Sequence, residues 1–288
     1  MSHSKRAIVL FLLACSAACG RQVVHFDADA GPEADAGSGG KGGGAGHAGG
    51  AGGAGHAGGA GDAGHAGGAA DGSMDMPTAA CRQTTVNLRS AAGFAVLGGS
   101  TVTNGGPTMV AGDLGLSPGT AITGFPPGIV VGTQHAGDPT AAQGIADLVT
   151  AYNDAKGRTL CPVSVAGNLG GLTLAPGLYL STSSLEISSG DLTLDAKGDS
   201  NAVFIFQMAS TLTTTVGRQV ILTNGAAAGN VFWQVGSSAT LGGSSVFDGT
   251  IMADQTITLN SGATLNGRAL AHIGAVNLAS NSIVGPPL

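Results

Sequence analysis

The chain has 288 residues, of which 52 are glycine, while only 10% are charged and 4% are aromatic. Its formal net charge of −6, without any basic cluster, argues against a nucleic-acid partner. Evenly spread glycine at this level would be typical of a disordered chain, but here much of it is concentrated in one segment.

Residues 1–19 have the composition of a secretory signal. Lys5 and Arg6 precede the apolar run AIVLFLLA, which is too short to span a bilayer. Cys19 in SAACG resembles the cysteine of a lipobox, which is acylated in bacterial lipoproteins. Cys15 in LLAC is an alternative, and a signal that is simply cleaved is another. We expect export, with a lipid anchor at Cys19 that holds the protein at the outer membrane or cell surface, or otherwise secretion.

Residues 20–80 are predicted to form a disordered linker rich in glycine and alanine. A nine-residue repeat, first seen as GHAGGAGGA, places His47, His56 and His65 in phase. No large apolar side chain occurs between residues 37 and 73, so this part of the segment cannot form a core. Spaced histidines can bind a transition metal weakly. We interpret them instead as polar residues of a spacer and predict no metal site and no cofactor.

Residues 81–288 are predicted to form the folded domain. Two cysteines remain outside the signal, Cys81 and Cys161. In an exported protein such a pair most simply forms a disulfide, and two buried free thiols are the alternative.

The segment DPTAAQGIADLVTAYNDAKG, beginning at Asp138, predicts the domain's one long helix. Asp138 suits the N-cap, Pro139 the first helical position and Gly157 the end of the helix. Ala142, Ile145, Leu148, Val149 and Tyr152 lie three or four residues apart, which indicates one apolar side that packs on a flat partner.

A repeat of 18 to 19 residues predicts what that partner is. WQVGSSATL, IMADQTITL and LAHIGAVNL begin at Trp233, Ile251 and Leu270, and each ends in a short alternation of apolar and small polar residues. VFDGTI and TLNGRA add a second strand per repeat, again 18 residues apart. Repeats of this length are typical of a parallel β-solenoid, in which each coil stacks on the last.

In such a solenoid, equivalent positions of successive coils stack in a straight line. The recurring threonine would then form an outward ladder of Thr173, Thr193, Thr211 or Thr213, Thr240, Thr258 and Asn277. A rigid array of hydroxyl and methyl groups suits contact with an ordered water lattice. Threonine also simply favours strands, which is the alternative explanation.

The domain resembles the microbial family of ice-binding proteins. The resemblance rests on stretches found in order from residue 88 to 284, among them AAGFAVLGGSTVTN, HAGDPTAAQGIADLVTAYNDAKGR, GNLGGLTLAPGLY, NVFWQVGSSATLG and LNSGATLNGRALA. It implies an irregular β-solenoid of triangular section with one long helix alongside. It also implies ice binding through one flat face, often marked by a Thr-Ala/Gly-x-Thr/Asn motif, which Ser261-Gly262-Ala263-Thr264 approaches.

From the repeat and the resemblance together we expect a monomer that adsorbs to ice without a cofactor. The candidate ice-binding residues are Thr193, Thr213, Ser238, Thr240, Ser245, Thr256, Thr258, Ser261, Thr264 and Asn277.

Two other functions compete with ice binding. Polysaccharide-cleaving enzymes also use β-helices, but they need clustered carboxylates or a metal. The only tight acidic group, Asp191, Asp195 and Asp199, fits turns better, so we predict that the protein is not an enzyme. A cell-surface adhesin or structural solenoid without ice activity agrees equally well with a lipid anchor and spacer.

Overall fold

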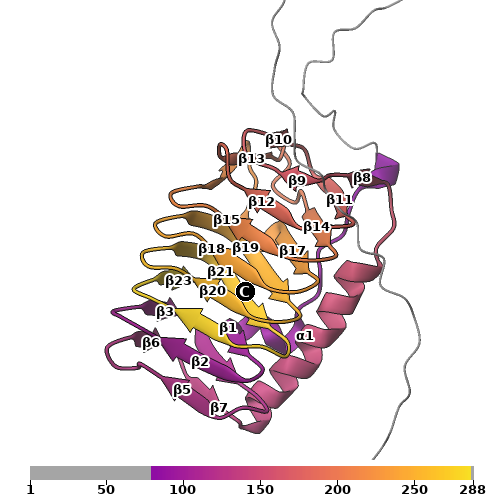
Figure 1. Cartoon of the computed structure of the whole chain (residues 1–288). Coiled ribbons are helices and arrows are strands. Elements are labelled where there is room, and N and C mark those ends of the chain that lie inside the picture. Colours follow the sequence, from indigo (N-terminus) through magenta and orange to yellow (C-terminus); the bar gives the residue numbers. More distant parts are fainter. Residues whose placement is uncertain (1–78, 287–288) are drawn as a thin grey trace, which may run out of the picture. The chain divides into compact units, whose positions relative to one another are not determined.

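The computed structural model describes residues 79–286, and the predicted signal, most of the linker and Cys19 lie outside them. Within these residues the chain forms 23 strands, one α-helix and three 3-10 helices. All paired strands are parallel, and they lie in three sheets (Figure 1). The predicted β-solenoid with one long helix is therefore confirmed.

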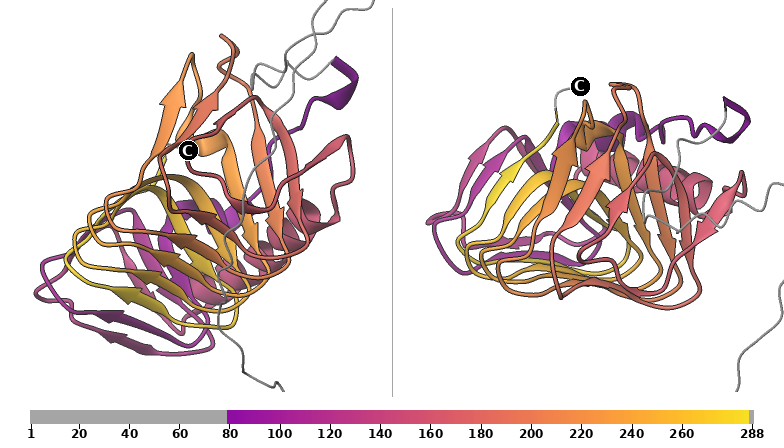
Figure 2. Two further views of the ribbon diagram at one scale, coloured as in Figure 1. Left: turned by 45° about the horizontal axis from the view of Figure 1, so that its top comes forward. Right: turned by 90° about the horizontal axis from the view of Figure 1, so that it is seen from above.

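Each coil of the solenoid contributes a strand to each of three faces, which gives the triangular section (Figure 2). We call the face against which the helix packs the helix face. In stacking order it consists of β7 (Gln134–Ala136), β4 (Asp113–Leu116), β1 (Phe94–Gly98), the second halves of β21 (Thr264–Ala271) and β19 (Val246–Ala253), β17 (Val231–Val235), β14 (Phe204–Met208), β11 (Gly177–Ser181) and β8 (Pro162–Ser164).

The second face is an eight-stranded sheet that we call the threonine face. In stacking order it consists of β5 (Ala121–Thr123), β2 (Thr101–Asn104), β22 (Val276–Leu278), β20 (Ile257–Leu259), β18 (Ala239–Leu241), β15 (Leu212–Thr214), β12 (Leu185–Ile187) and β9 (Gly167–Asn168).

The third face is divided. One part contains β6 (Ile129–Val131), β3 (Met109–Ala111), β23 (Ser282–Val284) and the first halves of β21 and β19. The other part is the three-stranded sheet β10 (Thr173–Leu174), β13 (Leu192–Asp195) and β16 (Val220–Thr223), which joins the first through the single bridge Gln219↔Val246.

Strands β19 and β21 turn the corner from the third face to the helix face without ending. The corner lies at Gly249 and Gly267, which pair with each other. A Cβ at Gly267 would lie 1.8 Å from the carbonyl oxygen of Gly249, so only glycine allows the two corners to stack. The predicted pairing of VFDGTI with TLNGRA is confirmed by this register.

The coils do not stack in chain order. The chain first forms β1 to β7, then α1 (Pro139–Gly157) returns along the helix face to the far end, where β8 begins (Figure 1). From β8 the coils proceed back until β22 pairs with β2 and the second half of β21 pairs with β1. The first coils and the last coils are therefore neighbours.

Helix α1 begins as the sequence predicts. The Asp138 carboxylate accepts a hydrogen bond from the Ala141 N–H at 2.9 Å, and Pro139 is the first helical residue. The side that packs on the sheet differs from the predicted stripe, since Leu148 and Tyr152 are buried but Ala142 is exposed. Small residues form part of the packed side instead. At Gly144, for example, a Cβ would lie 2.6 Å from the Phe94 ring, so no larger residue fits there.

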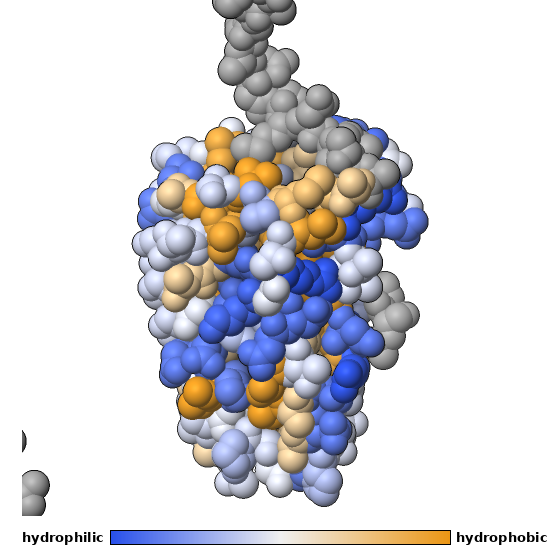
Figure 3. All heavy atoms as spheres, turned by 90° about the vertical axis from the view of Figure 1, so that its right-hand side faces the viewer, coloured by the Kyte–Doolittle hydropathy of each residue, from blue (hydrophilic) through white to orange (hydrophobic). Residues whose placement is uncertain are grey.

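The opposite side of α1 is polar. Gln143, Asn153, Asp154 and Lys156 are exposed, and hydrophilic residues cover much of the middle of this side of the domain (Figure 3). No helix in residues 79–286 is long and apolar enough to cross a membrane.

An aromatic stack fills the solenoid interior at one end. The rings of Tyr179, Phe206 and Trp233 stack with centroid distances of 5.1 and 4.0 Å, and Phe247 follows at 4.9 Å. The indole N–H of Trp233 donates to the Asp248 carbonyl at 3.1 Å, so its polar atom is satisfied in the core. Burial of this kind is the main stabilisation of the fold.

Cys81, at the end of η1 (Ala79–Cys81), and Cys161 form the predicted disulfide. Because Cys161 lies just beyond the C-terminal end of α1, the bond fixes the entry to the domain against that end of the helix. Gln83 and Arg158 strengthen the attachment, with Gln83 donating to the Leu160 carbonyl at 3.0 Å and Arg158 donating to the Thr84 carbonyl.

Candidate functional site

The threonine face carries two rows of outward side chains. Its central strands have the burial pattern buried–intermediate–buried, so the flanking apolar residues point inward and the middle residue points outward. The second outward position lies two residues earlier, directly before the central strands and at the first residue of β2 and β5.

Strand pairing aligns these positions across the coils. The first row is Ser184, Thr211, Ser238, Thr256, Ala275, Thr101 and Ala121. The second row is Asn168, Glu186, Thr213, Thr240, Thr258, Asn277, Thr103 and Thr123. Neighbours within a row lie one strand spacing apart, about 4.8 Å, and the rows lie about 6.6 Å apart.

Hydrogen bonds along the rows fix several of these side chains. Thr103 Oγ1 donates to Asn277 Oδ1 at 2.8 Å, and Asn277 Nδ2 lies 3.4 Å from Thr258 Oγ1. In the first row, Thr211 Oγ1 donates to Ser184 Oγ at 2.9 Å. The hydroxyl groups are therefore held on a rigid sheet and partly restricted in direction before any ligand arrives.

The two rows carry almost no charge. Glu186 is their only ionisable residue, and it lies near the β9 end. From Thr213 to Thr123 the second row contains only threonine and asparagine. This surface is suited to contact with a neutral, hydrogen-bonded ligand rather than with ions.

The structure brings six of the ten candidate residues together on this face. They are Thr213, Ser238, Thr240, Thr256, Thr258 and Asn277.

The other four candidates lie elsewhere. Thr193 is in β13 and Thr264 begins β21, so both belong to the third face. Ser261 is exposed in the turn between β20 and β21. Ser245 is 0% exposed and donates its hydroxyl to the Gly242 carbonyl, so it cannot contact an outside surface. The predicted ladder also included Thr173, which pairs with Thr193 on the third face and not with the threonine face.

The candidate list missed members of the face that come from the first coils. Thr101, Thr103 and Thr123 extend the rows beyond Asn277 because β2 pairs with β22 and β5 pairs with β2. A local signal was available in STVT, which repeats the threonine-x-threonine alternation, whereas TAIT has alanine at the first of the two outward positions. The missing information was the position of these strands in the stack.

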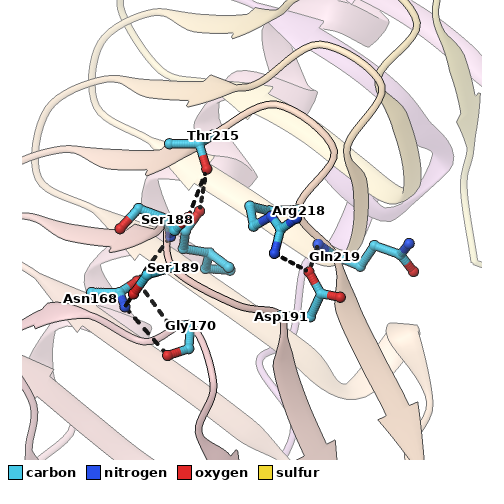
Figure 4. A network of polar contacts seen from close by, with 9 residues as sticks. Asn168, Gly170, Ser188, Ser189, Asp191, Thr215, Arg218 and Gln219 are labelled. Carbon is cyan, nitrogen blue, oxygen red and sulfur yellow. Dashed lines mark hydrogen bonds and ion pairs between the residues drawn. The ribbon is translucent and has the colours of Figure 1, made fainter.

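A polar network closes the corner beside the β9 end of the threonine face (Figure 4). Asn168 accepts from the Ser188 N–H at 2.8 Å and donates to Ser189 Oγ at 2.6 Å. Asp191 accepts from the Gln219 N–H at 3.0 Å and pairs with Arg218 at 3.5 Å. These bonds join successive coils. Asp191 therefore stabilises a turn, as predicted for this acidic residue.

Residues 79–286 contain no group of three or more His, Cys, Asp or Glu side chains arranged to hold a metal ion. His135 and His272 each contact a carboxylate, Asp138 at 2.7 Å and Asp254 at 3.0 Å. Both pairs lie at ends of helix-face strands.

Fold and face together define a class of protein, a helix-supported parallel β-solenoid that presents a flat, nearly uncharged array of hydroxyl groups. Comparison with known proteins identifies the family. The model of the ice-binding-like family matches residues 96–284, and the chain belongs to that family. The predicted family is confirmed, and membership supports the prediction that the chain is not an enzyme.

Similar proteins include an ice-binding protein of Nostoc sp. (strain HG1), 50% identical over 199 residues, which are 68% of this chain and 72% of that protein. An ice-binding protein of Flavobacterium frigoris (strain PS1) is 36% identical over 235 residues, 74% of this chain and 83% of that protein. Among solved structures, an ice-binding protein from an Antarctic biological consortium has a TM-score of 0.73 at 55% identity, with 75% of this chain and 96% of that chain covered. One from Antarctomyces psychrotrophicus has a TM-score of 0.69 at 41% identity, covering 71% and 100%.

Proposed function

We propose that the protein binds ice and that the threonine face is the surface that contacts it. The observation that carries the proposal is the double row of hydroxyl groups on a flat, rigid, nearly uncharged sheet. Membership of the family, and relatives that are named as ice-binding proteins, support the same function.

The mechanism that fits this surface is adsorption. Threonine offers a hydroxyl that bonds water and a methyl group that does not, so water over the rows is ordered without being held as tightly as around a charge. Such a layer can merge with the ice front. Ice between adsorbed molecules must then grow with a curved surface, which is unfavourable, and growth stops. No proton transfer and no cofactor takes part.

Thr258→Tyr tests the face. Thr258 lies in the middle of the second row and is half-exposed, so a tyrosine there would project and keep the surface from a flat contact. We expect inhibition of ice recrystallisation to fall at least about tenfold in potency, while the folded state changes little, because surface substitutions usually alter stability by about 0.5 kcal/mol or less.

Thr264→Tyr is the matched control, because Thr264 is also a half-exposed strand threonine but lies on the third face. We expect it to inhibit recrystallisation like the wild type. If the wild type does not restrict grain size at micromolar concentration, the function itself is wrong. If Thr264→Tyr loses activity and Thr258→Tyr does not, the face is wrong.

We further propose that the protein acts as a monomer tethered at the cell envelope through an acylated Cys19. The lipobox-like sequence before Cys19 and the glycine-rich spacer support this, since an anchored ice-binding domain must extend away from the membrane to contact ice. Cys19→Ser should release the protein into the medium, with Cys15→Ser as the control that stays attached. Release by Cys15→Ser alone would move the anchor to that residue, and a wild type already in the medium would refute the tether. Sedimentation of the released protein at the mass of a dimer would refute the monomer.

A further inference from the structure

Arg268 is a buried cation without an anionic partner in the described part of the chain. It lies in the second half of β21 and is only 5% exposed. Its Nε donates to the Ala92 carbonyl at 2.9 Å and its Nη2 to the Pro286 carbonyl at 3.1 Å. Among residues 79–286 no carboxylate lies within ion-pair distance of this guanidinium. Buried charges are normally paired, because removing a charge from water is costly.

The guanidinium lines a surface groove. The groove has a volume of about 380 Å³ and lies between the segment 85–92 and strands β17 and β21. Arg89 brings a second cation to it, with a side chain that is 57% exposed and 3.8 Å from its nearest carboxylate, Asp147. Thr85 and Asn87 add polar groups, and Phe232 adds an apolar wall. The local balance is positive in a protein whose overall charge is −6.

A second, independent observation concerns Thr250 on the same sheet. Thr250 pairs in register with Phe232 on one side and with Arg268 on the other, so its side chain lies between two residues that line the groove. Its Oγ1 is the only fully buried side-chain oxygen or nitrogen in residues 79–286 that has no hydrogen-bond partner. Thr250 is fully buried and does not itself line the groove, but a hydroxyl without a hydrogen-bond partner therefore lies in the sheet directly beside a cation that lacks an anion.

We propose that this groove binds an oxyanion, with Arg268 as the principal contact and Arg89 as the supporting cation. A guanidinium has five N–H donors in a planar fork, and two of those of Arg268 are used by the two carbonyl groups. The remaining donors suit two oxygens of a phosphate or carboxylate, which is the geometry in which arginine binds them most strongly. Arg268 and its groove lie on the helix face, so the anion site is separate from the threonine face.

Burial also lowers the pKa of Arg268, because its charged form loses contact with water. An anion in the groove would offset that cost, so its binding should stabilise the folded protein. This gives a measurement that does not depend on ice binding.

The test is a titration of the whole exported protein with inorganic phosphate and, separately, with acetate, against chloride at equal ionic strength. We expect one of the two anions to raise the Tm and to give a one-to-one calorimetric isotherm. Phosphate alone would indicate a phosphate-bearing ligand, and acetate alone a carboxylate. Arg268→Gln should abolish the effect, and Arg89→Gln should weaken binding about tenfold, as expected for loss of about 1.4 kcal/mol.

Arg218→Gln is the control, since it removes a partly exposed arginine that pairs with Asp191 and does not line the groove, and its isotherm should match the wild type. If Arg268→Gln fails to fold, Arg89→Gln still decides the matter, because Arg89 is exposed and its loss should spare the fold. The proposal is overturned if neither anion binds the wild type, or if Arg218→Gln weakens binding as much as Arg89→Gln. Ice recrystallisation inhibition by Arg89→Gln should equal that of the wild type.

Discussion

Replacing both Cys81 and Cys161 by serine should lower the stability of the domain by an amount that the chain length between them sets. The disulfide joins residues 80 positions apart. In the chain-entropy model, opening a loop of that size costs about 4.5 kcal/mol at 25 °C. A domain of this size loses about 2–4 °C of Tm per kcal/mol, so the double serine variant should melt about 9–18 °C below the wild type.

Thermal unfolding followed by circular dichroism, without reducing agent, measures this difference. Local contacts could in principle hold the same two segments together without the bond, since Gln83 binds the Leu160 carbonyl and Arg158 binds the Thr84 carbonyl. A two-state melting curve with a loss of less than about 3 °C would show that these contacts suffice and would refute the entropic reasoning. Ice activity of the folded variant should be unchanged in the cold, because neither cysteine belongs to the threonine face.

Three further substitutions probe the core, the groove and the helix cap. Trp233→Ala removes the ring stacked 4.0 Å from Phe206 and should lower the free energy of unfolding, measured in urea, by about 3–5 kcal/mol. Thr250→Val removes the unpartnered buried hydroxyl, so in the absence of added anion the same measurement should show equal or higher stability, by up to about 1–3 kcal/mol. Hydrogen bonds from the Ala141 N–H and from His135 hold the pKa of Asp138 below its usual value, so its carboxylate stabilises the fold above the pKa of the unfolded chain and loses that effect as pH falls. Asp138→Asn should therefore melt lower than the wild type at pH 6, and the difference should shrink in melts below about pH 4.

Local sequence predicted the elements whose signals are local. The N-cap at Asp138 and the proline after it are enough to begin α1, because they satisfy the first N–H groups and fix the first φ angle. The 18-residue spacing likewise predicted the register of β19 on β21, since glycine stacks on glycine only in that register. The disulfide followed from the number of cysteines.

Alternation could not predict which face a strand joins. Thr193 and Thr240 have the same surroundings in the sequence, a leucine or alanine on one side and a leucine on the other, and both point outward between buried neighbours. Period-two alternation separates inside from outside, but all three faces of the solenoid obey it equally. The choice of face depends on the lengths of the turns between strands, so the sequence alone did not show that Thr193 and Thr264 lie on the third face.

The order of the coils is the second feature that no local signal carries, and the extent of the threonine face depends on it. If the coils stacked in chain order, β2 would lie far from β22 and the rows would end at Asn277. Because α1 carries the chain back to the far end first, β2 meets β22, and Thr103 bonds Asn277 across 174 residues of sequence. A fragment beginning at Pro162 would keep all three copies of the repeat that revealed the solenoid. It would lose Thr101, Thr103 and Thr123, and it would leave the edge of β22 unpaired. The complete face is thus a product of the closure between the first and last coils, and contacts of such high sequence separation form late and slowly in folding.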